Sequence, residues 1–428
     1  MMRSMFSGVS GLRNHQLRMD VIGNNIANVN TIGYKRARVT FQDMLSQNIR
    51  GASSPQGGKG GTNPQQIGLG MTVNSIDILH TQGSSETTGK VTDMMVDGDG
   101  FFMVGDGNNT FYTRAGNFDF DSAGNLISPS GLMVKGWMAD DSSGDIDTTG
   151  AISGIQIPKG QAIQPQETQN ISLVGNLDAN AVTYDDTVTP PTGTTVPVSL
   201  TVYDSLGNSW PLTLHLDKDS ASGQWLVTRI DNPGWTTAPS VSGGPIIFDS
   251  TGKLTAAGDG PLVITGAPPN ANAFVAGTNP ITVDISSLTG YASDSGESNV
   301  ELNSQDGYSS GVLNGYSIDK TGIVTGRFSN GLTKQLAQVT LANFNNPAGL
   351  MKVGENNYVS SNNSGQAQIG TAGSGGRGDI SPGKIEMSNV DLSQEFTDMI
   401  VTQRGFQANS RIITVSDEML QELVNLKR

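Results

Sequence analysis

Residues 388–424 read SNVDLSQEFTDMIVTQRGFQANSRIITVSDEMLQELV, and this stretch decides the architecture of the C-terminal end of the chain. Apolar residues recur in it every seven positions, with one further residue on the same stripe: Leu392, Phe396, Met399, Phe406, Ile413 and Leu420. This period is typical of a helix that packs along a partner. Asp391 followed by Gln394 has the pattern of a helix N-cap. We therefore expect one long C-terminal helix.

The first 30 residues show the same period. Their apolar stripe is formed by Met5, Val9, Leu12, Met19, Ile22 and Ile26. This spacing predicts a second long helix, at the opposite end of the chain. We expect the N- and C-terminal helices to pair in a coiled-coil-like core.

The residues between the two helices have the pattern of strands and turns. Short apolar runs alternate with glycine and aspartate, as in β sandwiches and barrels. The sequence Asp-x-x-Gly recurs as a predicted hairpin connector at Asp121, Asp204, Asp249 and Asp319. The predicted fold class is therefore α+β and mainly β, with two nested antiparallel domains that are sandwich-like or barrel-like.

Composition predicts the domain boundaries. Residues 48–70 and 370–383 are rich in Gly, Ser and Pro, which favours linkers. The predicted domains are a terminal helical domain (1–47 plus 384–428), a first, inner β domain (71–140 plus 297–369) and a second, outer β domain inserted into the first (141–296).

Composition and charge also exclude several classes of protein. The 428 residues carry a formal net charge of −14, which argues against nucleic-acid binding because phosphate contacts need clustered Lys and Arg. The sequence has no cysteine, so disulfides and Cys-ligated zinc are excluded. We find no apolar run long enough to cross a membrane and no cleavable signal peptide. We expect neither a nucleic-acid partner nor membrane insertion.

Motifs of catalysis lack their required context. GYSSG at 307–311 matches a nucleophile elbow around Ser309, but all three histidines precede it, whereas that motif needs a later histidine. GSGGRG at 373–378 has no strand before it and no helix after it. The carboxylates near Asp97 and Asp119 lack the closing glutamate of a calcium loop. We predict no enzyme activity, no catalytic residue, no cofactor and no metal site.

The two apolar stripes need partners. Packing of both helices on the body of the same chain is one alternative. A helix behind a flexible linker packs more readily on the other terminus or on a neighbouring chain, and an isolated helix is marginal in water. We therefore expect the terminal helices to be weakly ordered in a free monomer and to fold on association. Identical subunits whose contact does not close form an open helical filament, so we predict a homo-oligomer assembled through these stripes.

Both ends also carry longer motifs. The segments SGVSGL (7–12), DVIGNNIAN (20–28), TIGYK (31–35), SNVDL (388–392) and QRGFQANS (403–410) closely resemble the bacterial flagellar rod and hook family. DGDGFF (97–102) and YTRAG (112–116) extend the resemblance into the first β domain. The motif residues that it assigns are Asn24, Asn25, Ile26, Ala27, Asn28, Gly33, Tyr34, Asn389, Asp391, Gln403 and Arg404.

The resemblance implies a structural subunit of the extracellular flagellum. Short rod members have little between their termini, and the second inserted β domain is similar to that of the hook subunit. A hook subunit forms a flexible tube, a universal joint that transmits torque from rod to filament. The implied partners are the distal rod protein, the hook cap protein, the hook–filament junction protein and the flagellar type III export apparatus, which needs no cleaved signal peptide. The alternatives are a distal rod or junction subunit, or, from another class, a secreted β-rich adhesin or binding module that stays monomeric.

Overall fold

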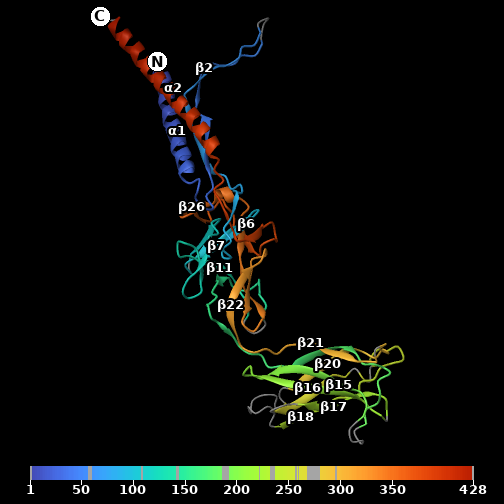
Figure 1. The fold of residues 1–428 in the computed structure, drawn as a ribbon. Coiled ribbons are helices and arrows are strands. Elements are labelled where there is room, and N and C mark those ends of the chain that lie inside the picture. The colour runs from blue at the N-terminus through green and yellow to red at the C-terminus, as the bar shows by residue number, and fades with distance from the viewer. Residues whose placement is uncertain are drawn as a thin grey trace. The chain divides into compact units, whose positions relative to one another are not determined.

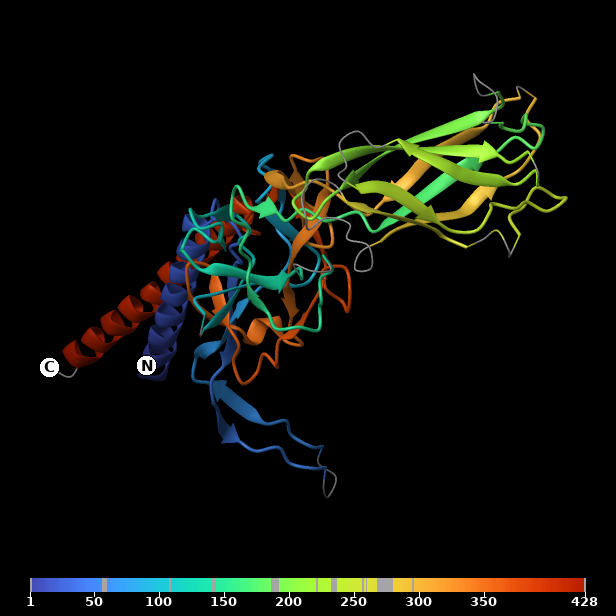
Figure 2. The same cartoon turned by 90° about the horizontal axis from the view of Figure 1, so that it is seen from below.

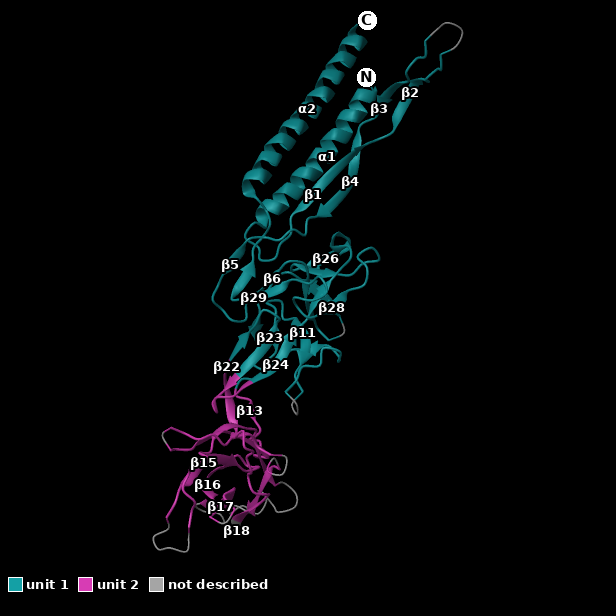
Figure 3. Cartoon of the chain, turned by 90° about the vertical axis from the view of Figure 1, so that its right-hand side faces the viewer, with its two compact units in different colours: residues 1–159, 316–326, 334–428 teal, residues 160–315, 327–333 magenta. Residues whose placement is uncertain are grey.

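The computed structural model describes residues 2–55, 60–107, 109–140, 144–185, 192–220, 222–231, 237–255, 258, 260–267, 280–294 and 296–426. The chain forms two compact units, and unit 2 is inserted into unit 1. Unit 1 comprises residues 1–159, 316–326 and 334–428, and unit 2 comprises 160–315 and 327–333 (Figure 3).

Unit 1 contains both helices and most of the strands. Its elements are α1 (Met2–Ala27), β1 (Ala37–Asp43), β2 (Ser46–Arg50), β3 (Gln65–Gly68), β4 (Met71–Ile78), β5 (Ser85–Thr87), β6 (Met94–Asp97), β7 (Phe101–Gly105), β8 (Thr110–Thr113), β9 (Asp119–Phe120), β10 (Leu126–Ile127), β11 (Met133–Met138), β12 (Ser153–Gly154), β24 (Thr333–Val339), β25 (Leu341–Asn343), the 3-10 helix η1 (Pro347–Gly349), β26 (Met351–Gly354), β27 (Asn357–Val359), β28 (Gln368–Gly370), β29 (Asp379–Pro382), β30 (Lys384–Glu386) and α2 (Leu392–Asn425).

Unit 2 is built from strands. Its elements are β13 (Ala162–Ile163), β14 (Asn170–Asn176), β15 (Thr195–Tyr203), β16 (Ser209–Lys218), β17 (Trp225–Asp231), β18 (Thr237–Ser242), β19 (Leu262–Ala267), β20 (Ile281–Thr289) and β21 (Asn299–Gln305). Two further strands, β22 (Gly311–Ile318) and β23 (Ile323–Phe328), are divided between the units, and the first residue of β24, Thr333, also belongs to unit 2.

The two terminal helices form where the sequence predicts them and lie side by side in unit 1 (Figure 1). Asp391 is the N-cap of α2, because its side chain accepts hydrogen bonds from the backbone N–H groups of Ser393 and Gln394. No helix in the described part of the chain is both long enough and apolar enough to cross a bilayer.

The segment predicted as a linker at 48–70 has a strand at each of its two ends, within β2 and β3. β1 pairs with β4 in antiparallel register, and β2 pairs with β3 beyond them, so the segment is a long hairpin (Figure 2). Every residue of β2 and β3 is exposed. A ladder with solvent on both faces needs no apolar alternation, which is why hydrophobic periodicity missed it.

The second predicted linker, 370–383, is also tied into unit 1. β29 pairs with β6 along Asp379–Pro382, and the Arg377 guanidinium donates to the backbone oxygen of Thr371 at 3.0 Å. These contacts are made by the backbone and by an arginine side chain, and the single buried Ile380 of β29 is too little to give a periodic apolar pattern.

The first β domain is an antiparallel sheet in which β24, β11, β7, β8, β27 and β26 are successive neighbours. Part of its core is a cluster of aromatic and aliphatic side chains that includes Phe101, Tyr112, Phe344 and Tyr358.

Unit 2 has a five-stranded sheet (β18-β19-β20-β14-β21) and a three-stranded sheet (β15-β16-β17). Both contribute to one apolar core, and inward residues alternate along β15 at Val196, Val198, Leu200 and Val202. The expectation of antiparallel domains was wrong for one pair of neighbouring strands in the described part of unit 2, because β14 and β20 are parallel; the isolated bridge between Tyr184 and Asp219 is parallel as well.

The inserted unit begins at 160 and ends near 315, whereas the sequence predicts 141 and 296. Strand pairing explains the difference. β12 (Ser153–Gly154) pairs with β11 of unit 1, and β21 (Asn299–Gln305) pairs with β14 of unit 2.

Candidate functional site

The predicted apolar stripes divide between the contact of the two helices and the outer surface. Ile22 is buried, and eight stripe residues are half-buried: Met5, Leu12, Met19, Ile26, Met399, Phe406, Ile413 and Leu420. Val9, Leu392 and Phe396 are exposed instead. The structure therefore does not place all predicted assembly residues along one seam.

Small and polar residues occupy the closest part of the helix contact. The buried residues are Gly8, Gly11, Ile22 and Asn25 on α1, and Glu395, Thr402 and Ser416 on α2. A Cβ on Gly8 would lie 3.2 Å from Ile413 Cγ1, so the missing side chain lets the helices approach. Because alternate positions of the contact are polar, the pair departs from the expected apolar coiled coil.

A second apolar stripe on α2 was not predicted from the sequence as a separate face, although Leu423 was expected to widen the first stripe. It is formed by Val401, Ile412, Val415, Met419 and Leu423, which are 44–57% exposed. We call these five residues the outer stripe. The spacing of 412, 415, 419 and 423 places them on one helix face, and this 3–4 pattern is the signal that could have found them. Met2 and Phe6 are similarly exposed on α1.

Three of the motif residues, Asn25, Tyr34 and Asn389, meet at a junction between the helices and the hairpin. The amide of the buried Asn25 donates to the backbone oxygen of Ala37 at 2.8 Å and to Glu395 Oε2 at 3.2 Å, and its oxygen accepts from the Ala37 N–H at 3.0 Å. The Tyr34 hydroxyl donates to the same oxygen at 3.3 Å. Asn25 thus ties α1, β1 and α2 together.

Asn389 makes the corresponding contacts from the C-terminal side. Its Oδ1 accepts from the N–H of Arg36 at 2.8 Å, and its Nδ2 donates to the backbone oxygen of Leu79 at 2.8 Å. The guanidinium of Arg36 lies 3.7 Å from Glu395 Oε1. Burial, followed by the charge of Glu395, raises the pKa of Tyr34. The junction is therefore a polar network in which a tyrosine stays neutral.

Asn24 and Asn28 end α1. Asn28 Nδ2 donates to the backbone oxygen of Asn24 at 2.8 Å, and Thr31 Oγ1 donates to Asn28 Oδ1 at 3.1 Å. Ala27 of the same motif is exposed, as are Gln403 and Arg404 along α2. These three residues are not part of the buried junction.

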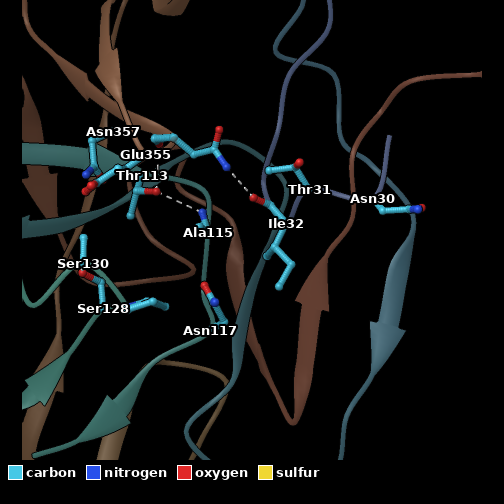
Figure 4. Close-up of a pocket in the computed structure, with 12 residues that line it drawn as sticks. Asn30, Thr31, Ile32, Thr113, Ala115, Asn117, Ser128, Ser130, Glu355 and Asn357 are labelled. Atoms are coloured by element: carbon cyan, nitrogen blue, oxygen red, sulfur yellow. Dashed lines mark hydrogen bonds between the residues drawn. The ribbon is translucent and has the colours of Figure 1, made fainter. Parts of the chain in front are cut away.

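A pocket of about 450 Å³ lies beside the segment that follows α1 (Figure 4). Its lining carries amides, hydroxyls and one carboxylate, from Asn30, Thr31, Thr113, Asn117, Ser128, Ser130, Glu355, Asn356 and Asn357. The turn at Glu355 and Asn356 has positive φ at both residues, and Asn356 Nδ2 donates to the backbone oxygen of Ile32 at 2.9 Å. Several of these polar groups are already engaged within the chain, since Thr113 Oγ1 also donates to the backbone oxygen of Asn356 at 3.0 Å.

The described residues contain no group of three or more His, Cys, Asp or Glu side chains placed to hold a metal ion. The carboxylates at the Asp-x-x-Gly turns are used locally instead. Asp121 Oδ1, for example, accepts from the N–H groups of Ala123 and Asn125, and Asp319 Oδ1 accepts from those of Thr321 and Ile323.

Family models cover most of this architecture. The matches are "Flagella basal body rod protein" over residues 5–35, "Flagellar hook protein FlgE/F/G D1 domain" over 95–178, "Flagellar basal body protein FlaE D2 domain" over 176–308, and "Flagellar basal body rod FlgEFG protein C-terminal" over 381–426. Together with the paired terminal helices and the inserted β unit, they define a protein of the bacterial flagellar rod and hook class.

Full-length relatives narrow the class. The flagellar hook protein FlgE of Borreliella burgdorferi is 44% identical, and that of Treponema pallidum is 41% identical, each over 100% of both chains. The flagellar basal-body rod protein FlgG of Bacillus subtilis is 32% identical over 100% of both chains. The chain belongs to the flagellar hook protein family.

Proposed function

We propose that this protein is a structural subunit of the bacterial flagellar hook and assembles with copies of itself into an open helical tube. Full-length similarity to flagellar hook proteins supports the function. The observation that carries the mode of assembly is the outer stripe, which stays exposed although α1 and α2 are already packed together. Large apolar side chains exposed along one face of a helix indicate a protein interface.

Identical copies supply the simplest partner for this surface. Each chain carries the outer stripe on α2 and the exposed Met2, Phe6 and Val9 on α1. A contact between two different faces of identical subunits repeats without closing, and such a repeat generates a helical tube. The terminal helices then form the continuous inner layer.

The β units suit the mechanical role of a universal joint that transmits torque from rod to filament. Each unit has a separate apolar core, so each holds its shape without the other. Rigid modules on a continuous helical layer allow the tube to bend while it rotates.

The proposed partners follow from this place in the flagellum. They are the distal rod protein at one end, the hook cap protein during growth, the hook–filament junction protein at the other end, and the type III export apparatus that delivers the subunit. A chain without cysteine passes from a reducing to an oxidising compartment without forming disulfides.

Charge placed on the outer stripe tests the proposal. The double variant Ile412→Asp and Val415→Asp should keep the helical signal in circular dichroism and lose tube formation, measured by sedimentation and electron microscopy. The matched control is Gln407→Asp, which adds a carboxylate at an exposed polar position of the same helix and should still form tubes. Phe406 and Ile413 are less suitable, because they are half-buried. Tubes formed normally by the double variant would contradict the proposed interface.

The same measurement separates the alternatives. A secreted adhesin or binding module would remain a monomer at every concentration, with or without the substitutions. A distal rod or junction subunit would assemble, but would restore motility only to a strain that lacks the corresponding rod or junction gene. We expect rescue of a strain that lacks its hook subunit.

A further inference from the structure

A fully buried carboxylate, Glu386, lies between the segment that follows α1 and the segment that precedes α2. Its Oε1 accepts from Lys35 Nζ at 2.6 Å and from the N–H of Gly83 at 2.8 Å. Its Oε2 lies 3.5 Å from Arg114 Nη1. The side chains of Lys35 and Glu386 have no exposed surface, and that of Arg114 is 3% exposed.

Each member of this ion cluster comes from a different part of the sequence. Lys35 follows α1, Arg114 follows β8 of the first β domain, and Glu386 ends β30 just before α2. The backbone joins the same segments, because the Gly33 N–H donates to the backbone oxygen of Glu386 at 2.8 Å. The cluster is therefore the place where both terminal segments contact the first β domain together.

Each cation also has backbone partners, among them the backbone oxygen of Val96, which accepts from Arg114 Nη1 at 3.4 Å. Lys35 Nζ also donates to the backbone oxygen of Thr81 at 2.7 Å, and Arg114 Nη2 donates to that of Gly98 at 2.8 Å. Burial lowers the pKa of both Lys35 and Arg114, and the charge of Glu386 opposes this in each case. For Arg114 the charge of Asp99 opposes it as well, so Glu386 is the main counter-charge and Asp99 a second one. Without Glu386, two like charges would share a site without solvent, which is strongly unfavourable.

We propose that Lys35, Glu386 and Arg114 form a clasp that makes the docking of the two terminal segments on the first β domain one cooperative step. The N-terminal segment adds the cation Lys35 to a site that already holds Arg114. The N-terminal segment therefore docks only when the C-terminal segment supplies the carboxylate of Glu386. The clasp acts within one chain, and it stands or falls independently of tube formation.

Hydrogen exchange of the full-length chain, read by mass spectrometry, tests the coupling. Glu386→Gln should raise exchange by about tenfold or more in residues 33–43 as well as in residues 384–391, because removing one partner of a buried ion pair is costly. Lys35→Met should produce the reciprocal effect at 384–391. Strands β15 and β16 of unit 2 should keep their protection in both variants, which shows that the rest of the chain is folded.

Two further variants keep the test decisive. Asp119→Asn removes the partner of Lys90 in a pair whose side chains are 47% and 69% exposed, and it should change exchange in neither terminal segment. The double variant Lys35→Met with Glu386→Gln removes one of the two cations that Glu386→Gln leaves without their carboxylate, and it should recover part of the protection that Glu386→Gln alone loses. The proposal is overturned if Glu386→Gln affects only its own segment, if the double variant recovers nothing, or if residues 33–36 of the unchanged chain exchange without protection.

Discussion

Gly405 of α2 lies directly against His15 of α1. A Cβ built on Gly405 would be 2.9 Å from both Cε1 and Nε2 of the imidazole, closer than real Cβ atoms approach a neighbour. A glycine inside a helix costs about 1 kcal/mol relative to alanine. Here it permits close approach, as Gly11 does where its Cβ would meet the side chain of Asn409.

The first prediction concerns this contact. Gly405→Val should push His15 out of its position and loosen the helix pair by about 1–3 kcal/mol, the usual cost of overpacking. Thermal unfolding by circular dichroism and hydrogen exchange of α1 measure the loss.

Gly23 on α1 is the matched control. Apart from its chain neighbours and the backbone of its own helix turn, no atom lies within 4 Å of a Cβ built on Gly23. Gly23→Ala should therefore stabilise α1 by up to about 1 kcal/mol through helix propensity alone. Equal thermal stability of Gly405→Val and the unchanged chain would show that the helices have room for a larger side chain at this contact.

The sequence predicts the two helices well, because a seven-residue apolar period and the Asp391 cap are local signals. It predicts less about which faces meet. Gly11, Asn25, Glu395 and Thr402 are buried in or beside the helix contact, yet none is apolar enough to contribute to hydrophobic periodicity. Their burial depends on close approach and on hydrogen bonds between distant segments, which a local pattern does not encode.

The two Gly-rich segments were predicted as linkers but contain paired strands. Residues 48–70 and 370–383 have linker composition, yet part of each is held in backbone ladders. Composition measures the tendency to bury apolar side chains, whereas these strands are held by main-chain pairing. The motif residues Asn25, Tyr34 and Asn389 could be identified from the family resemblance, but their shared network could not.

A second prediction concerns Gly33, whose φ is +68° and whose Cβ would lie 2.6 Å from the backbone nitrogen of Ala115. Gly33→Ala must move rigid backbone in addition to adopting an unfavourable φ, so it should destabilise the junction by more than about 1 kcal/mol. Urea unfolding followed by Trp fluorescence measures the change.

Gly131 separates the two costs. Its φ is +82°, and no atom lies within 4 Å of a Cβ built on it, so Gly131→Ala bears only the cost of the backbone conformation. We expect about 1 kcal/mol there. If Gly33→Ala lowers the free energy of unfolding no more than Gly131→Ala does, the close approach of Gly33 to Ala115 does not contribute to stability.

A third prediction concerns the start of α2. Asp391 Oδ1 accepts from the N–H of Ser393 at 2.9 Å and from that of Gln394 at 3.3 Å. Asp391→Ala should destabilise α2 by about 1 kcal/mol, whereas Asp391→Asn or Asp391→Ser should retain most of the cap. Exchange rates of the first helical turn distinguish them, and an unchanged rate in Asp391→Ala would show that the cap does not stabilise α2.

The last prediction is a pH dependence that originates at His80. The imidazole packs against the rings of Phe101 and Tyr358, with centroids 5.6 and 5.5 Å away, and neither ring nitrogen has a hydrogen-bond partner among the described residues. Burial, then the charges of Lys35 and Arg114, lowers its pKa from 6.5 to about 4. Between these pH values the unfolded chain binds a proton that the folded chain excludes.

The contribution of His80 is therefore complete above pH 6.5 and is lost as the pH falls toward 4. The loss amounts to roughly 3 kcal/mol at 1.36 kcal/mol per pKa unit. His80→Phe keeps the aromatic packing and removes the titration, so its unfolding free energy should fall less steeply than that of the unchanged chain over this range. Between pH 7 and 9 the unfolding free energies of His80→Phe and of the unchanged chain should change with pH in parallel, because the imidazole is neutral in both the folded and the unfolded state. Parallel curves from pH 7 to 4 would show that the imidazole is hydrated and not excluded from water as its contacts indicate.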